Sequence, residues 1–366
     1  MRLKKQNFVI KGWASLLISL AVLLFSMPAG AEDSIPAEIK ALVTSNRWAS
    51  SVVDESGKRQ IAIHDGDTIT RLTQGHFDNK PSWSKTGDML TFFRWHRSSA
   101  LGITFSKGVQ DNLFNIYRTN ICVINVDGKG IRELTDDSHA NLNPTWTRDG
   151  SNQIIFTRFH SLGLGQRIYM IDPGGEKNSA VVVTSKCRRW PLHFDWVESG
   201  LTDGRLFIWR MHWLRFVLNI IKPGDTMDGI QTFHLLDPKT QTYEDVKRPN
   251  KYPVHKLSVS PSETKVCYMK DLNGNPMSYN DSVIAYAEFD LNGREVKNEV
   301  VISPDDRSYT DMYPRWSPDE KYIMYSSSRS GKWMQYVYSL ETKETYMVSD
   351  PGLHGDFFPC FEDMPK

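Results

Sequence analysis

Residues 309–328 read Tyr-Thr-Asp-Met-Tyr-Pro-Arg-Trp-Ser-Pro-Asp-Glu-Lys-Tyr-Ile-Met-Tyr-Ser-Ser-Ser. The central Ser317-Pro318-Asp319-Glu320 predicts a tight turn, because Pro318 presets φ at the first corner and Asp319 can hydrogen-bond the backbone. The flanking residues are aromatic or β-branched, as a half-buried strand prefers. The stretch predicts a β-hairpin, and a single hairpin needs similar neighbours to bury its faces.

The chain contains further copies of this hairpin. Residues 79–92 and 143–156 repeat it closely, and residues 194–207 and 257–268 repeat it weakly. An aromatic or apolar residue aligns at positions 83, 146, 196, 259 and 316. The steps of 63, 50, 63 and 57 residues between these positions leave room for one four-stranded propeller blade each.

The C-terminus supplies a strand that the repeats otherwise lack, because six outer hairpins can be read but only five inner ones. His354-x4-Pro359-x-Phe361 has the same spacing as His76-x4-Pro81-x-Trp83 and His139-x4-Pro144-x-Trp146. We therefore predict an all-β, six-bladed β-propeller, in which residues 354–361 pair with the first strands and leave no free edge. Seven blades is the alternative, if residues 209–235 contain an extra hairpin.

The N-terminus has the pattern of an export signal. Four basic residues precede the apolar run 14–27, and Ala29-Gly30-Ala31 predicts cleavage before Glu32. We expect residues 32–366 to form one periplasmic or secreted domain with no stable membrane span. Without residues 1–31 the chain has 40 Lys and Arg against 43 Asp and Glu, which argues against a nucleic-acid-binding protein.

The chain has four cysteines, Cys122, Cys187, Cys267 and Cys360, and no Cys-x-x-Cys pair. An oxidising compartment would permit disulfides. The alternative is that these residues are small buried hydrophobes on strands.

The repeats resemble those of the TolB-like β-propeller family over nearly the whole of residues 32–366. That repeat ends an outer strand with Leu-Thr and continues through a Pro-x-Trp-Ser-Pro-Asp-Gly-Lys turn. The matching residues here are Leu72-Thr73, Pro81-Ser-Trp83-Ser, Leu134-Thr135, Pro144-Thr-Trp146 and Pro314-Arg-Trp316-Ser-Pro318-Asp319. The resemblance implies the propeller fold. It extends distantly to secreted propeller lyases that act on uronic-acid polysaccharides, although the closely spaced His-x-His of oligogalacturonide lyases is absent here.

Two sets of residues are expected to meet at one end of the propeller. The first set is the entry position, just before each innermost strand: His76, His139, Arg189, Tyr252, Tyr309 and His354. The second set ends each following strand. Here an apolar residue is followed by Arg and then His at intervals of two: Phe92-x-Arg94-x-His96, Phe156-x-Arg158-x-His160 and Ile208-x-Arg210-x-His212.

Period 2 places the three residues of each motif on one side of a strand. With His193 nearby, they would form a basic, imidazole-rich arc, and such an arc on a net acidic protein suggests an anionic ligand. The alternative is that each motif binds backbone carbonyls of the next blade. Three imidazoles, His76, His139 and His354, could also hold zinc or manganese.

These patterns leave two functional hypotheses. The first is a noncatalytic propeller that binds an acidic polysaccharide or an envelope protein. The second is a polysaccharide lyase acting by β-elimination. In the lyase, Arg158 or Arg210 would neutralise the uronate carboxylate, His160 or His96 would abstract the proton, and His139 or Tyr252 would protonate the leaving oxygen.

Overall fold

A computed structural model describes residues 35–96, 118–137, 139–159, 166–184, 193–212, 231–250, 252–272, 282–303 and 308–361. In this part of the chain one short helix, α1 (Ala37–Ser45), precedes antiparallel strands. None of the helices within these ranges is both long and apolar enough to cross a membrane.

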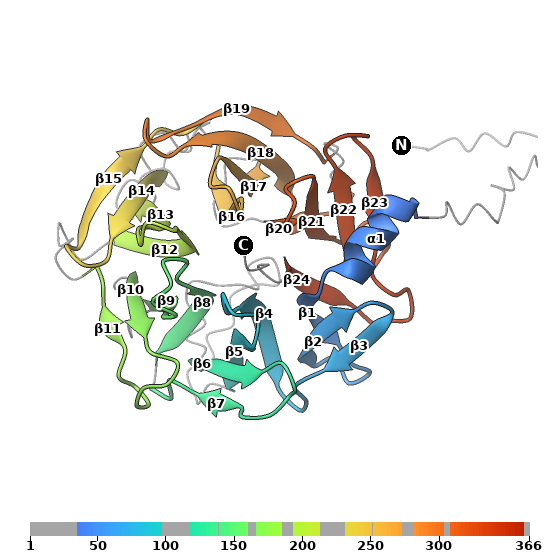
Figure 1. The fold of residues 1–366 in the computed structure, drawn as a ribbon, viewed down its shortest axis with the longest axis horizontal. Coiled ribbons are helices and arrows are strands. Elements are labelled where there is room, and N and C mark those ends of the chain that lie inside the picture. The colour runs from blue at the N-terminus through green and yellow to red at the C-terminus, as the bar shows by residue number, and fades with distance from the viewer. Residues whose placement is uncertain are drawn as a thin grey trace, which may run out of the picture. The chain divides into compact units, whose positions relative to one another are not determined.

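The strands fall into groups of four, which we call units, arranged around a common centre (Figure 1). The β4 and β8 units are joined into one eight-stranded sheet by a single parallel bridge, Thr119 to Ala140. We call the innermost strand of each unit its first strand, and the other three strands follow outward from it. The units are β24 (Asp356–Phe361), β1 (Trp48–Val53), β2 (Arg59–Asp65) and β3 (Thr68–Arg71); β4 (Phe77–Trp83), β5 (Met89–His96), β6 (Arg118–Asn125) and β7 (Arg132–Glu133); β8 (Ala140–Trp146), β9 (Ile154–Phe159), β10 (Gln166–Ile171) and β11 (Val181–Val182); β12 (His193–Gly200), β13 (Leu206–His212), β14 (Gln231–Asp237) and β15 (Thr242–Val246); β16 (Val254–Val259), β17 (Lys265–Asp271), β18 (Ser282–Asp290) and β19 (Glu295–Val301); and β20 (Asp311–Trp316), β21 (Tyr322–Ser327), β22 (Met334–Ser339) and β23 (Thr345–Met347).

The turn between β20 and β21 forms as its residues predict. The Glu320 amide donates to the Ser317 carbonyl at 3.0 Å, and the Lys321 amide donates to Asp319 Oδ1 at 3.1 Å. The aromatic residues of this hairpin face the core, where Trp316 is buried and Tyr325 is completely so.

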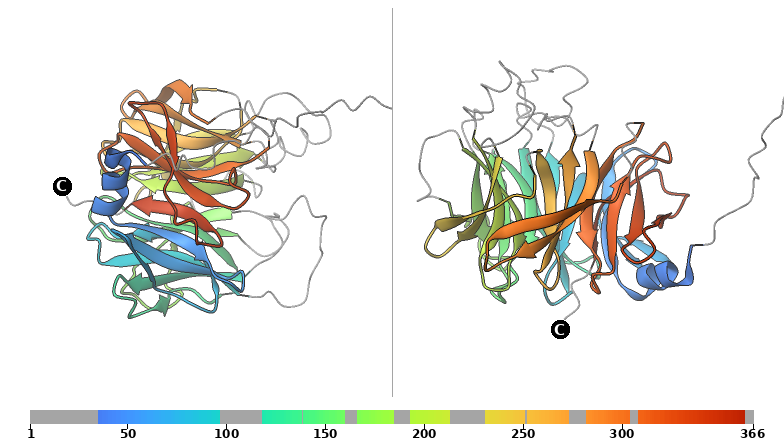
Figure 2. Two further views of the ribbon diagram at one scale, coloured as in Figure 1. Left: turned by 90° about the vertical axis from the view of Figure 1, so that its right-hand side faces the viewer. Right: turned by 90° about the horizontal axis from the view of Figure 1, so that it is seen from above.

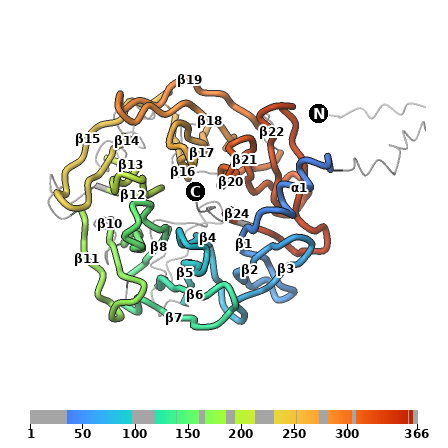
Figure 3. The backbone as a smooth tube through the Cα atoms, viewed as in Figure 1, coloured from blue at the N-terminus to red at the C-terminus, as the bar shows by residue number. Residues whose placement is uncertain are grey.

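The last strand of the chain, β24, pairs with β1, as the matched spacing of the C-terminal residues predicts. In the antiparallel pair β24 and β1, Phe361 lies opposite Trp48 and Asp356 lies opposite Val52. The first strands also contact one another in succession, from β4 through β8, β12, β16, β20 and β24 back to β4 (Figure 3). Residues from the two ends of the described chain therefore complete one unit.

Helix α1 covers the place where these two ends meet. Its Ile39 and Leu42 pack with Trp48 of β1 and Phe361 of β24, and with Met324 and Val337 of the β20 unit.

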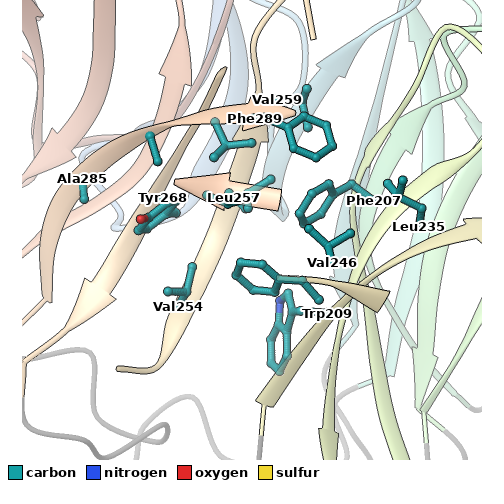
Figure 4. Close-up of a cluster of buried hydrophobic side chains, with 14 of the residues drawn as sticks. Phe207, Trp209, Leu235, Val246, Val254, Leu257, Val259, Tyr268, Ala285 and Phe289 are labelled. Carbon is teal, nitrogen blue, oxygen red and sulfur yellow. The ribbon is translucent and has the colours of Figure 1, made fainter. Parts of the chain in front are cut away.

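The core lies between the faces of neighbouring units. Phe207 and Trp209 of β13 pack toward Leu257 of β16 and Tyr268 of β17 in the largest of these clusters (Figure 4). A strand buried on both faces reads as a nearly continuous apolar run, which explains why residues 206–209 read Leu-Phe-Ile-Trp.

The register corrects two alignments made from the sequence. Asp195 pairs with Arg210 as Asp78 pairs with Arg94, which makes His193, and not Arg189, the entry residue of the β12 unit. By the same register Gly200, and not Trp196, occupies the position of Trp83 and Trp146. A Cβ at Gly200 would lie 3.0 Å from the Trp146 carbonyl oxygen, so the strand passes too close there for a large side chain.

Candidate functional site

The first strand of each unit begins, and the second strand ends, at one end of the sheets, which we call the top face. The pairs Phe77 to Trp95 and His193 to His212 lie there. Helix α1 lies at the opposite end (Figure 2). The side chain of Arg47, just after α1, accordingly reaches the carbonyl of Gly87 in the β4–β5 turn at 3.2 Å.

A set of buried acidic residues at the top face was missed by the sequence analysis. It occupies the position two residues after each entry residue, on the first strand. The six residues at this position are Asp78, Asn141, Asp195, Val254, Asp311 and Asp356, and the four aspartates among them make up the acidic set. The aspartates are all at most 4 % exposed. The recurring signal His-x-Asp or Tyr-x-Asp could have revealed them.

Arg94 pairs with the first of these aspartates. Its Nε and Nη2 donate to the two carboxylate oxygens of Asp78 at 2.8 and 2.9 Å. His96, two residues on, lies half-buried with its Nε2 3.0 Å from Asn120 Nδ2 and 3.3 Å from Glu133 Oε1. His76 is exposed beside them, and partial burial together with the charge of Arg94 lowers the pKa of its imidazole.

Arg158 and Arg210 are held in the same way. Arg158 Nε donates to Asn141 Oδ1 at 2.7 Å, and its Nη2 lies 2.6 Å from Asp137 Oδ2. Arg210, 3 % exposed, donates to both oxygens of Asp195 at 2.6 and 3.2 Å. Burial disfavours the charged form of Arg210, but Asp195 outweighs this and raises the pKa of the guanidinium.

The predicted basic arc is therefore largely neutralised. Each of the three arginines donates hydrogen bonds to an acidic or amide side chain on the first strand of its own unit. The alternative interpretation, in which these arginines bind backbone carbonyls of the next blade, is wrong for these contacts, because their partners are the side chains of Asp78, Asn141 and Asp195.

The other predicted site residues are spread around the top face. Tyr252 is 39 % exposed with Lys270 Nζ 4.9 Å from its ring centroid. His139 and His212 are half-buried, and His354 is exposed. His160 and Arg189 lie outside the described residues. So do most of the long connections 95–118 and 209–229, and most of residues 209–235, where the seventh-blade alternative would lie. Only the backbone of His193 is described.

His354 lines a pocket at the top of the unit that contains β1 and β24. The pocket has a volume of about 360 Å³ and is also lined by Asp54, Glu55, Gln60 and Arg71, with Val53 and Leu353 as apolar contacts. Gln60 is 8 % exposed. Its Nε2 donates to Asp54 Oδ2 at 3.0 Å, and its Oε1 is buried without a hydrogen-bond partner in the described structure.

The described residues contain no group of three His, Cys, Asp or Glu side chains arranged to hold a metal ion. Zinc or manganese at His76, His139 and His354 stays a prediction. Cys122 and Cys267 are buried free thiols, and burial raises both pKa values. Cys360 is half-buried, and Cys187 lies outside the described residues.

Comparison with known proteins finds likeness in structure alone. No protein-family model matches the chain, and no curated protein sequence matches it. TolB from Acinetobacter baumannii superposes with a TM-score of 0.59 at 12% sequence identity, over 87% of this chain and 67% of TolB. Hydrazine synthase of Kuenenia stuttgartiensis superposes with a TM-score of 0.59 at 13% sequence identity, over 88% of this chain and 47% of the hydrazine synthase chain. This chain therefore spans about half the length of that protein chain.

An oligogalacturonate lyase in complex with manganese gives a TM-score of only 0.45 at 12% identity, over 79% of this chain and 85% of the lyase. That likeness is too low to support an argument about activity. The higher scores, at such low identity, establish the architecture and nothing finer. The chain is thus similar to TolB in fold, and its described residues form an all-β structure of the TolB-like propeller kind.

Proposed function

We propose that this protein is an exported, noncatalytic β-propeller that binds an acidic glycan at its top face. The observation that carries the proposal is the pocket of about 360 Å³ beside His354, whose lining combines Arg71 with Glu55 and Gln60. Ligand pockets are typically of this size and larger, with a few polar groups that fix orientation.

The side chains of the pocket suit a sugar that carries a carboxylate. Arg71 can donate two parallel hydrogen bonds to a carboxylate, and His354 can donate a further one. The carboxylate of Glu55 can accept from sugar hydroxyls. The pocket thus offers donors and acceptors together, as a uronic acid residue requires.

The pairing of the arginines favours binding over β-elimination. A lyase needs cationic donors free to stabilise the developing enolate. Arg158 and Arg210 instead direct their donors at Asn141, Asp137 and Asp195. The lyase, with His160 or His96 as base, is the alternative, and an ultraviolet assay for unsaturated uronate products after incubation with acidic polysaccharides tests it directly.

We infer that the four-stranded units are six blades of one ring closed by β24. The pairing of β24 with β1 and the succession of contacts among the first strands support this count. A closed ring provides a rigid top face, on which residues far apart in sequence keep a fixed spacing.

Retardation in native gels that contain an acidic or a neutral polysaccharide tests the proposed function. We expect the acidic polymer to slow the wild-type protein and the neutral one not to. Arg71→Gln should lose the retardation, whereas Lys129→Gln should keep it, because Lys129 is an exposed lysine in the turn at the opposite end of the sheets. Equal retardation of both variants would refute the pocket as the site. Absence of retardation by every acidic polymer would leave an envelope protein as the partner to test and would refute the glycan.

A further inference from the structure

The pocket proposed for the glycan lies where the two ends of the described chain meet. Its lining residues form two sets that are far apart in the sequence. One set belongs to β1, β2, β3 and the turn between β1 and β2, and the other precedes β24. The first set is Val53, Asp54, Glu55, Gln60 and Arg71, and the second is Gly352, Leu353 and His354. A ligand that fills the pocket therefore contacts both ends of the described chain.

A short ladder joins the two sets beside the pocket. Strand β24 lies next to β1, although the two strands stand near opposite ends of the described chain (Figure 1). The Val53 amide donates to the Gly355 carbonyl at 2.8 Å, next to His354 in the sequence. Further along the pair, the register shifts between Ala49 and Ser51. A shift of this kind interrupts the ladder, so it weakens the hold of β24 on β1.

The neighbouring β20 unit holds the segment in front of β24. Lys332, in the connection between β21 and β22, donates from Nζ to the carbonyl oxygens of Pro351 and Leu353, both at 2.6 Å. The Asp356 amide donates to the Trp333 carbonyl at 2.8 Å. The pocket wall next to β24 is thus attached to the β20 unit, whereas the opposite wall is built on β1, β2 and β3.

Lys332 supports this wall from behind. Its side chain is not among those that line the pocket, but it binds the carbonyl of Leu353, which does line it. Hydrogen bonds from a charged donor are roughly twice as strong as neutral ones. One ammonium group on two carbonyls fixes the course of the chain that leads into His354. The position of His354 in the pocket therefore depends on Lys332.

Separation of β24 from β1 would pull the two walls of the pocket apart. Proteins open locally in cooperative units, at a smaller free energy than complete unfolding requires. A ligand that contacts both walls binds the closed arrangement only, so it shifts the equilibrium toward that arrangement. By the same linkage, a change that loosens β24 weakens the binding of the ligand.

We propose that a uronic-acid chain bound in this pocket locks β24 onto β1, and that Lys332 positions the wall that carries His354. Arg71 belongs to one set of lining residues and His354 to the other, so a sugar that uses both donors spans the junction of the two strands. The inference rests on the glycan-binding function proposed above. It adds that occupancy of the pocket controls how firmly β24 is held.

Hydrogen exchange of the full chain, followed by mass spectrometry with and without a defined uronic-acid oligosaccharide, tests the lock. Without ligand, we expect the amides of residues 356–361 to exchange faster than those of β17, which lies between β16 and β18. At about a hundred times the Kd, the ligand should slow exchange at residues 356–361 roughly tenfold or more. The outermost strand β19 should be unchanged, because its fraying leaves the pocket intact.

Variants of Lys332 test the positioning role. Lys332→Met removes both hydrogen bonds and keeps an apolar stem, so the chain should fold. It should exchange faster at residues 356–361 and bind the oligosaccharide roughly tenfold more weakly. Lys332→Arg should restore both properties, because a guanidinium can donate to the same carbonyls. Lys129→Met, at an exposed lysine in the turn at the opposite end of the sheets, should change neither.

The outcomes separate this inference from the function on which it rests. Oligosaccharide binding without slower exchange at residues 356–361 refutes the lock and leaves the proposed function standing, whereas absence of binding refutes both. The lock is also refuted if, without ligand, β24 exchanges as slowly as β17. Wild-type affinity in Lys332→Met refutes the positioning role. Should Lys332→Met fail to fold, the same two measurements are made on Lys332→Gln, with the same expectation.

Discussion

At the scale of single residues, the arginines at the top face act together with acidic partners that the sequence analysis did not identify. The Arg-x-His motifs are visible because they recur at the same offset after an apolar residue. Their partners Asp78 and Asp195 lie 16 and 15 residues upstream, and only the strand register places them opposite Arg94 and Arg210. The positive charges visible along the sequence therefore indicate a basic arc, although in the folded chain Asp78 neutralises the charge of Arg94 and Asp195 that of Arg210.

We predict that Arg210→Met lowers the free energy of unfolding by about 3 kcal/mol, because it leaves the buried carboxylate of Asp195 without its partner. Urea denaturation measures the loss. The double variant with Asp195→Leu should regain most of it. Glycan retardation per folded molecule should be unchanged in Arg210→Met. If the variant instead keeps full stability and loses binding, Arg210 belongs to the ligand site and its role as a brace is wrong.

At the scale of elements, the spacing of the repeats predicted the hairpins and the return of the last strand. It failed at the β12 unit, which lacks the Pro-x-Trp landmark of the β4, β8 and β20 units. The sequence points to Trp196 as the landmark, but Trp196 lies opposite Trp209 and stacks on it with ring centroids 4.0 Å apart. A glycine at the true position, Gly200, leaves no sequence pattern to align.

Deletion of residues 350–366 should abolish cooperative folding. It removes β24, which pairs with β1, and with it Phe361 from the cluster beneath α1. It also removes the Cys360 carbonyl that accepts from Trp83 Nε1 at 3.0 Å. Circular dichroism during heating checks this, and a truncated chain that melts like the full one would show that β24 does not close the structure.

At the scale of the whole molecule, buried histidines link stability to pH. Burial lowers the pKa of His64 and of His255 to about 3, and that of His234 to about 4, from an ordinary value of 6.5. Below pH 6.5 the unfolded chain therefore binds more protons than the folded one, so stability is fully present above this pH and declines as the pH falls toward 3.

We predict a loss of up to about 1.4 kcal/mol per pH unit for each of these histidines between pH 6.5 and 5. Urea denaturation at pH 7, 6 and 5 measures it. His64→Asn should reduce the slope even if it lowers stability overall, because His64 is one of the three groups that must charge. A stability that does not change between pH 7 and 5 contradicts the buried neutral state of these residues.

Export is a second prediction at this scale, and it rests on residues 1–31, which lie outside the described part. We expect the mature chain to begin at Glu32 and to occur in the periplasm or the medium. Intact-mass measurement of the exported protein checks it. A mass that retains Met1 would show that the segment is not cleaved.

The central claim is that the top-face pocket beside His354 binds an acidic sugar without turning it over. Titration calorimetry of a defined uronic-acid oligosaccharide into the wild-type protein and into Arg71→Gln, with product absorbance recorded on the same samples, tests it most directly. We predict saturable binding to the wild-type protein, roughly tenfold to hundredfold weaker binding to Arg71→Gln, and no unsaturated product from either. Equal affinity of the two proteins, or unsaturated product from the wild-type protein, would contradict it.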